Sequence, residues 1–275
     1  MSTTTLPTIS VDGLNVAYSD TGDGPPVLLL HGWPTSSYLW REIGPALARE
    51  HRVIAPDLPG FGASSKPVGT RYSFGLFERT LDALVNELGL EEMGLVVHDL
   101  GGPVGVHWAL TPPRRVSRLA LLNTLLYPEF SPAVVEFVTT LLDPVRRQEL
   151  VSPEGLTEVM RFGVSDPGSL PDETLAAVRA PFEPSEARQA LAEAGIGLAP
   201  NGFEEIARGL PGLEIPVLAL YGAEDRVLPD VAETFARVKR DIPHAEIVPL
   251  PGVGHFLQEE APELVAERLG RFFAA

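Results

Sequence analysis

Residues 94–102 read Gly-Leu-Val-Val-His-Asp-Leu-Gly-Gly, and this stretch decides the fold. An apolar run rich in β-branched residues ends in a polar pair, and two glycines then open a helix-like segment over residues 103–110. The pattern predicts a buried parallel strand, a sharp turn and the start of a helix. Such a turn raises one side chain above the end of the strand. That side chain is Asp99. The chemistry available at this turn therefore depends on a carboxylate.

Apolar runs and amphipathic segments alternate on both sides of this stretch. A turn pair, Asp12-Gly13, predicts an opening β-hairpin over residues 9–20. Further strands are expected at residues 26–30, 53–55, 116–123, 216–221 and 245–250, and helices at residues 74–88, 231–238 and 261–273. One more helix is expected after a cap near residues 35–37, with Leu39, Ile43 and Leu47 on its buried face. This alternation is typical of an α/β protein with a mostly parallel sheet covered on both faces.

The alternation breaks after Asn123. Residues from about 124 to 213 show helical periodicity, contain many prolines and offer no convincing strand. We therefore expect an α/β core formed by residues 1–123 and 214–275, with a helical lid, or cap, formed by residues 124–213.

Length and composition bound the possible functions. The 275 residues suffice for one large α/β domain with an inserted subdomain, or for two small domains. A net charge of −16 would repel nucleic acid and anionic membranes, so neither is expected as a partner. The lack of cysteine excludes disulfides, thiolate metal sites and a cysteine nucleophile. The polar first ten residues and the lack of an apolar run of about 18 residues predict a soluble, cytoplasmic protein.

Three polar residues at expected strand ends form a candidate site. They are Asp99, Asp225 in the sequence Gly-Ala-Glu-Asp, and His255 in the sequence Gly-Val-Gly-His-Phe. The carboxyl ends of strands in a doubly wound sheet face one crevice, so residues far apart in sequence meet there. The order along the chain is nucleophile, acid and base. Asp225 would hold the imidazole of His255 in one tautomer and offset its charge.

An oxyanion hole is expected beside this candidate triad. The turn places the backbone N–H of Leu100 over the site, and the loop after the strand at residues 26–30 contributes a second N–H, that of Trp33. Gly32 lets that loop approach closely. His31 is expected to bind loop backbone, and His98 to point away from the site into the fold.

Three motifs carry a resemblance to a known family. They are His-Gly-Trp-Pro-Thr-Ser-Ser-Tyr-Leu-Trp-Arg at residues 31–41, Asp-Leu-Pro-Gly-Phe-Gly at 57–62 and Val-His-Asp-Leu-Gly-Gly at 97–102. With them the chain resembles the α/β-hydrolase superfamily, and within it the haloalkane dehalogenases and their epoxide hydrolase relatives. The resemblance covers nearly the whole chain. It implies an α/β-hydrolase fold with a helical lid inserted in the core domain.

The chain departs from both groups in the residues that would activate a leaving group. Dehalogenases usually carry a halide-binding tryptophan where this chain has Leu100, and many carry asparagine where it has Trp33. The Trp33 indole and Arg146 or Arg147 of the lid are candidate replacements, and Arg146 lies near the place of the lid halide ligand in the resembling subgroup. Epoxide hydrolases usually use two lid tyrosines, of which this lid offers Tyr127 alone. Trp33, Tyr127 and Arg146 are thus the expected substrate or leaving-group residues.

A carboxylate nucleophile suits displacement at an sp3 carbon, which gives an alkyl–enzyme ester. We therefore expect a hydrolase in which Asp99 attacks such a carbon and His255, oriented by Asp225, activates the water that cleaves the ester. No metal or organic cofactor is called for, and the expected partners are water and a small hydrophobic substrate. The leading hypothesis is cleavage of a carbon–halogen bond. The alternatives are an epoxide hydrolase and a non-catalytic binding protein on a hydrolase scaffold.

Overall fold

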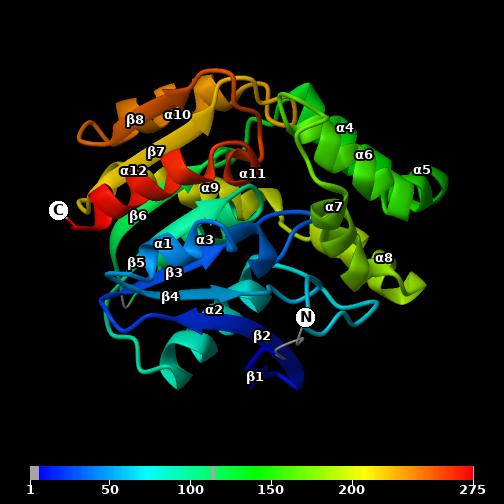
Figure 1. Cartoon of the computed structure of the whole chain (residues 1–275), viewed down its shortest axis with the longest axis horizontal. Coiled ribbons are helices and arrows are strands. Elements are labelled where there is room, and N and C mark those ends of the chain that lie inside the picture. Colours follow the sequence, from blue (N-terminus) through cyan, green and yellow to red (C-terminus); the bar gives the residue numbers. More distant parts are fainter. Residues whose placement is uncertain (1–5, 113–114, 275) are drawn as a thin grey trace.

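A computed structural model describes residues 6–112 and 115–274, and within them it contains an eight-stranded sheet in the order β1-β2-β4-β3-β5-β6-β7-β8 (Figure 1). β1 pairs antiparallel with β2, and β2 with β4, while the other neighbours are parallel. The expected hairpin and parallel sheet are therefore confirmed. The strands are β1 (Thr8–Val11), β2 (Leu14–Thr21), β3 (Pro26–Leu30), β4 (Arg52–Pro56), β5 (Met93–His98), β6 (Val116–Leu122), β7 (Val217–Gly222) and β8 (Glu246–Leu250).

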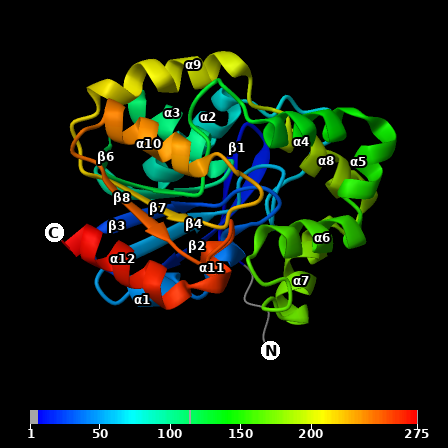
Figure 2. The same ribbon diagram turned by 90° about the horizontal axis from the view of Figure 1, so that it is seen from above.

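Helices cover both faces of the sheet, as Figure 2 shows from above. Successive side chains of a strand point to opposite faces, so Leu95 and Val97 of β5 join one apolar cluster and Val96 joins the other. The first face carries α2 (Phe74–Glu87), α3 (Gly101–Leu110), α9 (Pro200–Gly209) and α10 (Val231–Asp241). The second face carries α1 (Gly44–Leu47), α11 (Leu257–Glu260) and α12 (Pro262–Ala274).

Residues 124–213, called the helical segment below, are all described and contain no strand. Five of their helices lie together beyond the carboxyl ends of the parallel strands (Figures 1 and 2). These are α4 (Pro132–Leu142), α5 (Pro144–Leu150), α6 (Pro153–Gly163), α7 (Asp172–Arg179) and α8 (Ser185–Gly195). The short turns η2 (Ala180–Phe182) and η3 (Leu210–Gly212) flank α8 and α9. Within residues 6–112 and 115–274, no helix is long and apolar enough to cross a membrane.

The structure differs from the sequence-based expectation in several short elements. The expected helix after residues 35–37 is split into η1 (Ser37–Trp40) and α1, because Pro45 has no N–H with which to continue one helix. Ser36 caps η1, since its side chain accepts a hydrogen bond from the Tyr38 N–H. The helix expected at residue 103 begins at Gly101, and α11 was not expected at all.

Candidate active site

The turn between β5 and α3 places Asp99 at the carboxyl end of the sheet. Asp99 has a φ of 49°, in the left-handed region, and its carbonyl accepts a hydrogen bond from the Gly102 N–H at 2.9 Å. A Cβ on Gly102 would overlap the hydroxyl of Thr124, so only glycine lets the helix start so close to the next loop. The turn therefore fixes Asp99 above the strand, with its side chain 12% exposed.

Three strand ends bring Asp99, Asp225 and His255 together. His255 Nδ1 lies 2.8 Å from Asp225 Oδ2, and His255 Nε2 lies 3.6 Å from Asp99 Oδ2. All three residues are buried. The carboxyl ends of parallel strands meet at one edge, which explains how Asp99 meets two residues that lie more than 100 positions away in the sequence.

The electrostatics of this cluster favour an imidazolium between two carboxylates. Burial alone would lower the pKa of His255, but the charges of Asp225 and Asp99 outweigh it and raise that pKa to about 10. Burial would raise the pKa of each aspartate, yet the contacts with His255 hold both values below their ordinary range. The unbound site therefore holds an ionised Asp99 at neutral pH.

Asp225 accepts hydrogen bonds from other groups as well as from His255. Its Oδ1 accepts hydrogen bonds from the N–H groups of Val227 and Leu228, each at 2.8 Å. Its Oδ2 also accepts one from the side-chain Nδ2 of Asn123 at 2.6 Å, and the side-chain Oδ1 of Asn123 accepts the Gly222 N–H at 2.9 Å. The sequence reasoning missed Asn123 as a site residue. The signal that found Asp99, a polar residue directly after a buried strand, applies equally to Asn123.

Two backbone N–H groups face the Asp99 carboxylate. The Trp33 N–H donates to Asp99 Oδ1 at 2.7 Å, and the Leu100 N–H contributes to the low pKa of Asp99. A Cβ on Gly32 would overlap the Asp99 side chain, so this approach requires glycine. Both N–H groups expected to form an oxyanion hole thus lie beside the carboxylate itself. His31 binds loop backbone, the Gly32 carbonyl and the Leu58 N–H, each at 3.0 Å.

The helical segment contacts the site through Trp33. Its indole N–H donates to the Leu191 carbonyl of α8 at 3.2 Å, and its ring packs edge-to-face against Phe137 of α4 with centroids 4.9 Å apart. The indole N–H, a candidate leaving-group donor, therefore already has an acceptor. That bond would have to break before the indole N–H could reach a leaving group.

The structure does not bring Tyr127 or Arg146 to Asp99. The Tyr127 hydroxyl donates to Asp241 at 2.9 Å, and the Arg237 guanidinium lies over its ring at 3.9 Å, because Tyr127 faces α10. Arg146 lies on the outer surface of α5, with its side chain 43% exposed, and pairs with Glu136 of α4. Their expected contacts with substrate or leaving group have no support in this geometry.

His98 lies beside His255 and makes no hydrogen bond to Asp99. Its Nε2 donates to the His255 carbonyl at 3.0 Å, and the two rings lie 4.7 Å apart. Burial and then the neighbouring His255 lower the pKa of His98 to about 3. His98 is therefore a neutral hydrogen-bond donor to the backbone of His255.

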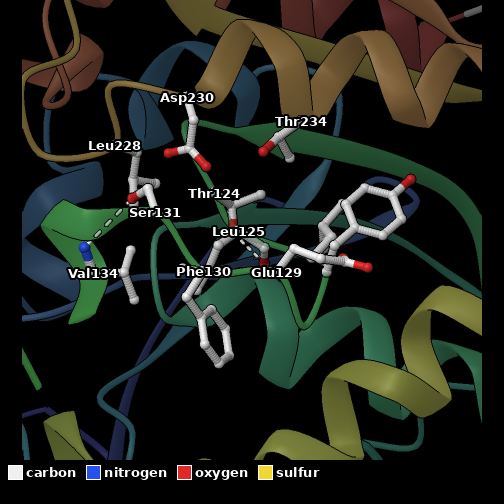
Figure 3. A pocket seen from close by; sticks show the side chains of 11 residues that line it. Thr124, Leu125, Glu129, Phe130, Ser131, Val134, Leu228, Asp230 and Thr234 are labelled. Atoms are coloured by element: carbon white, nitrogen blue, oxygen red, sulfur yellow. Dashed lines mark hydrogen bonds between the residues drawn. The ribbon is translucent and has the colours of Figure 1, made fainter.

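A small pocket lies where the start of α4 meets α10 (Figure 3). Its volume is about 20 Å³, which is enough for a single water molecule. The Thr124 hydroxyl in its wall donates to the Asp99 carbonyl at 2.7 Å, and Leu228 in its wall binds Asp225. Phe130, Ser131, Asp230 and Thr234 also line it. The pocket is too small for an organic substrate.

Comparison with known proteins agrees with this architecture. Residues 25–262 match the family described as alpha/beta hydrolase fold. The chain is 30% identical to a soluble epoxide hydrolase of Corynebacterium sp. (strain C12), over 96% of this chain and 95% of that protein. It is 31% identical to haloalkane dehalogenase 2 of Mycobacterium bovis, over 93% and 91%.

A solved structure shows the same fold. The crystal structure of the haloalkane dehalogenase DatA from Agrobacterium tumefaciens C58 matches with a TM-score of 0.85 and 29% identity, covering 98% of this chain and 96% of that one. The match extends through the helical segment as well as the sheet. The chain therefore belongs to the α/β-hydrolase family, as an enzyme related to haloalkane dehalogenases and epoxide hydrolases.

Proposed function

We propose that this hydrolase cleaves its substrate through an alkyl ester on Asp99, and that the bond broken is a carbon–halogen bond in a small apolar molecule. One observation carries the proposal. Asp99 Oδ1 is held by the Trp33 N–H at 2.7 Å, while Oδ2 faces His255 Nε2 at 3.6 Å. One oxygen is thus anchored to a donor, and the other is free to attack.

The first step forms the ester. An electron pair of Asp99 Oδ2 attacks the sp3 carbon, the carbon–halogen bond breaks, and the halide leaves with the bonding electrons. A carboxylate suits this displacement, whereas its attack on an ester carbonyl would give an anhydride that returns easily to reactants. The low pKa of Asp99 keeps the nucleophile ionised.

The second step hydrolyses the ester. Forming the ester removes the charge of Asp99, which is one of two charges that raise the pKa of His255. The pKa of His255 then falls and the imidazolium releases its proton to solvent. The neutral imidazole accepts a proton from water as the water oxygen bonds to Asp99 Cγ. The N–H groups of Trp33 and Leu100 stabilise the resulting oxyanion. The bond between Asp99 Cγ and the alkoxide oxygen then breaks, and the alcohol leaves with the proton from His255. The Asp99 carboxyl group finally transfers its own proton to His255, which restores the imidazolium.

We infer that residues 124–213 act as a lid on a core formed by residues 1–123 and 214–275. Support comes from the contacts that Phe137 and Leu191 make with Trp33. Trp33 itself lies directly beside Asp99. Burial under such a lid excludes bulk water and strengthens the interactions of the Asp99 charge.

Replacement of His255 tests the mechanism. His255→Ala should still form the ester but hydrolyse it more slowly by a factor of about 10²–10⁴, because it lacks the general base. Incubation with a bromoalkane followed by mass spectrometry should show the alkyl group on the peptide that contains Asp99. The double variant Asp99→Ala/His255→Ala is the matched control and should remain unmodified. If His255→Ala forms no adduct with any haloalkane or epoxide, the proposal is overturned.

A second candidate is epoxide hydrolysis by the same ester chemistry, which the 30% identity to a soluble epoxide hydrolase favours. Parallel assays with a bromoalkane and a styrene-type epoxide separate the two activities. Halide release with no diol supports the first candidate, and diol with no halide supports the second. Tight binding of both compounds without product would indicate a binding protein instead.

A further inference from the structure

We propose that Glu260 is a positioning residue for His255, which fastens the loop of the catalytic histidine to the helical segment. The helical segment then takes part in placing the general base, in addition to covering the site. The inference rests on the proposed function in one respect, namely that His255 hydrolyses the ester on Asp99.

The carboxylate of Glu260 joins two loops that are far apart in sequence. Its Oε2 accepts a hydrogen bond from the N–H of Gly254, the residue before His255, at 2.6 Å. Its Oε1 accepts the N–H of Ser165 at 2.7 Å and also the Ser165 hydroxyl. Ser165 is the second residue after Gly163, where α6 ends. One side chain therefore ties the His255 loop to the helical segment.

The backbone of His255 is held on both sides of its Cα. The His255 N–H donates to the Gly163 carbonyl of α6 at 2.6 Å, and the His255 carbonyl accepts from His98 Nε2 at 3.0 Å. The first bond comes from the helical segment and the second from β5. The imidazole position therefore depends on where the end of α6 lies relative to the sheet.

The end of α6 and the loop that carries His255 pack so closely that neither can shift without moving the other. A Cβ on Gly254 would lie 2.6 Å from the Gly163 carbonyl oxygen and 2.9 Å from both Glu260 Oε2 and the Ser165 nitrogen. A Cβ on Gly163 would overlap the ring of Phe256, the residue after His255. The Arg226 guanidinium, next to Asp225, donates to the Val164 carbonyl. Displacement of residues 163–165 would thus move the surroundings of both His255 and Asp225.

Substitutions of Glu260 have graded consequences. Glu260→Gln keeps the shape but has one acceptor oxygen, so it satisfies one loop and turns an amide N–H towards the other. Glu260→Ala removes both connections. Ester formation by Asp99 should stay near the wild-type rate, because Trp33, Leu100 and Asp99 make no contact with Glu260. Ester hydrolysis should slow by about 10²-fold in Glu260→Ala, since displacement of a catalytic group by about 1 Å has this effect. Glu260→Gln should lie between Glu260→Ala and the wild type.

The matched control is the preceding residue. Glu259 lies on the same helix, α11, and its carboxylate binds Arg41 at 2.6 and 2.7 Å, away from the His255 loop. Arg41 in turn donates to Thr174 of α7, so Glu259 also links the core to the helical segment. Glu259→Gln should therefore lower thermal stability without slowing ester hydrolysis selectively.

The experiment measures the two chemical steps separately. Wild type, Glu260→Gln, Glu260→Ala and Glu259→Gln are mixed with an excess of a bromoalkane, quenched at short times and analysed by intact mass and halide release. The inference predicts a normal halide burst followed by ester accumulation in both Glu260 variants. Wild-type hydrolysis of the ester in Glu260→Ala would overturn it, as would equal slowing of both steps in the Glu259 and Glu260 variants. If Glu260→Ala does not fold, Glu260→Gln carries the test.

A second readout needs no substrate. The proton shared between His255 Nδ1 and Asp225 gives a downfield NMR resonance, and loss of His255 positioning in Glu260→Gln should shift or broaden it, while Glu259→Gln leaves it unchanged. An unchanged resonance in Glu260→Gln would overturn the inference. If the wild type forms no ester at all, the proposed function fails, and this resonance still decides the role of Glu260.

Discussion

At the scale of single residues, the site depends on donors that leave neither carboxylate oxygen of Asp225 without a hydrogen bond. Asp225 accepts from His255, from Asn123 and from two backbone N–H groups. A buried carboxylate is tolerated in this way because each charge-assisted hydrogen bond offsets part of its desolvation. Asn123 lies directly after β6 and has a φ of 31°. This backbone conformation directs its side-chain amide towards Asp225.

We predict that Asn123→Ala is destabilising because it leaves the Gly222 N–H without its acceptor and Asp225 without one donor. The free energy of unfolding should fall by about 1–3 kcal/mol, the range for a buried group that loses its partner. Urea denaturation measures this change. Asn201→Ala, at an exposed position of α9, is the control and should change stability by less than about 0.5 kcal/mol. Equal effects of the two substitutions would contradict the role given to Asn123.

At the scale of elements, three helices meet at His107. This residue of α3 contacts Glu78 of α2 at 2.5 Å and Glu205 of α9 at 2.8 Å, and its ring stacks on Phe74 with centroids 4.6 Å apart. The hydrogen bond that His107 donates to the Glu78 carboxylate raises the pKa of His107, burial opposes the rise, and Glu205 adds to it. The protonated imidazole thus joins α3, which begins at the Asp99 turn, to the last long helix of the helical segment.

The raised pKa of His107 predicts a pH dependence of stability. Folding favours the protonated form, so the stabilisation is complete below the unfolded pKa of about 6.5 and disappears as pH rises through the folded pKa. His107→Gln should lower the melting temperature most at pH 6, and the difference from wild type should shrink towards pH 9. Calorimetry at several pH values measures it. His244→Gln, which removes a histidine bound to the Ile215 carbonyl, is the control. A difference that is constant with pH would contradict the prediction.

At the scale of the whole molecule, the site lies where the sheet and the helical segment meet. Trp33 connects the two, since its backbone N–H donates a hydrogen bond to Asp99 and its indole N–H donates one to Leu191 of α8. Glu260 and Gly163 make the corresponding connection on the His255 side. Asp99, through Trp33, and His255 are therefore each linked to the helical segment by hydrogen bonds.

Substitution of Trp33 separates its two roles. Trp33→Phe keeps the backbone N–H on Asp99 but removes the indole bond to Leu191, so the free energy of unfolding should fall by about 1 kcal/mol. The rate of ester formation should change by only a few fold, because the indole N–H is engaged with α8. Trp108→Phe, which loses an indole bond to Asp82 far from Asp99, is the control. A fall in ester formation of more than about 10²-fold in Trp33→Phe alone would show that the indole acts on the leaving group.

The local pattern of residues 94–102 was sufficient to predict a strand, a turn and a helix, because a buried β-branched run and a glycine pair restrict the backbone over a few residues. The same local signals located the strand ends that carry Asp99, Asp225 and His255, since parallel strands present their carboxyl ends at one edge. The split of the expected helix at Pro45 was also present in the sequence, as a missing backbone donor. The sequence by itself therefore determined the fold class and the candidate triad.

Only the tertiary structure decided where the other side chains point. Tyr127 and Arg146 were expected at the site, yet packing turns them towards Asp241 and Glu136. Glu260 carried no local signal, because its partner Ser165 lies 95 residues away along the chain. Backbone pattern follows from neighbours in sequence, whereas side-chain contacts follow from the way distant elements pack. This is why Asp99 was apparent from the sequence as a candidate site residue, and the contacts of Glu260 were not.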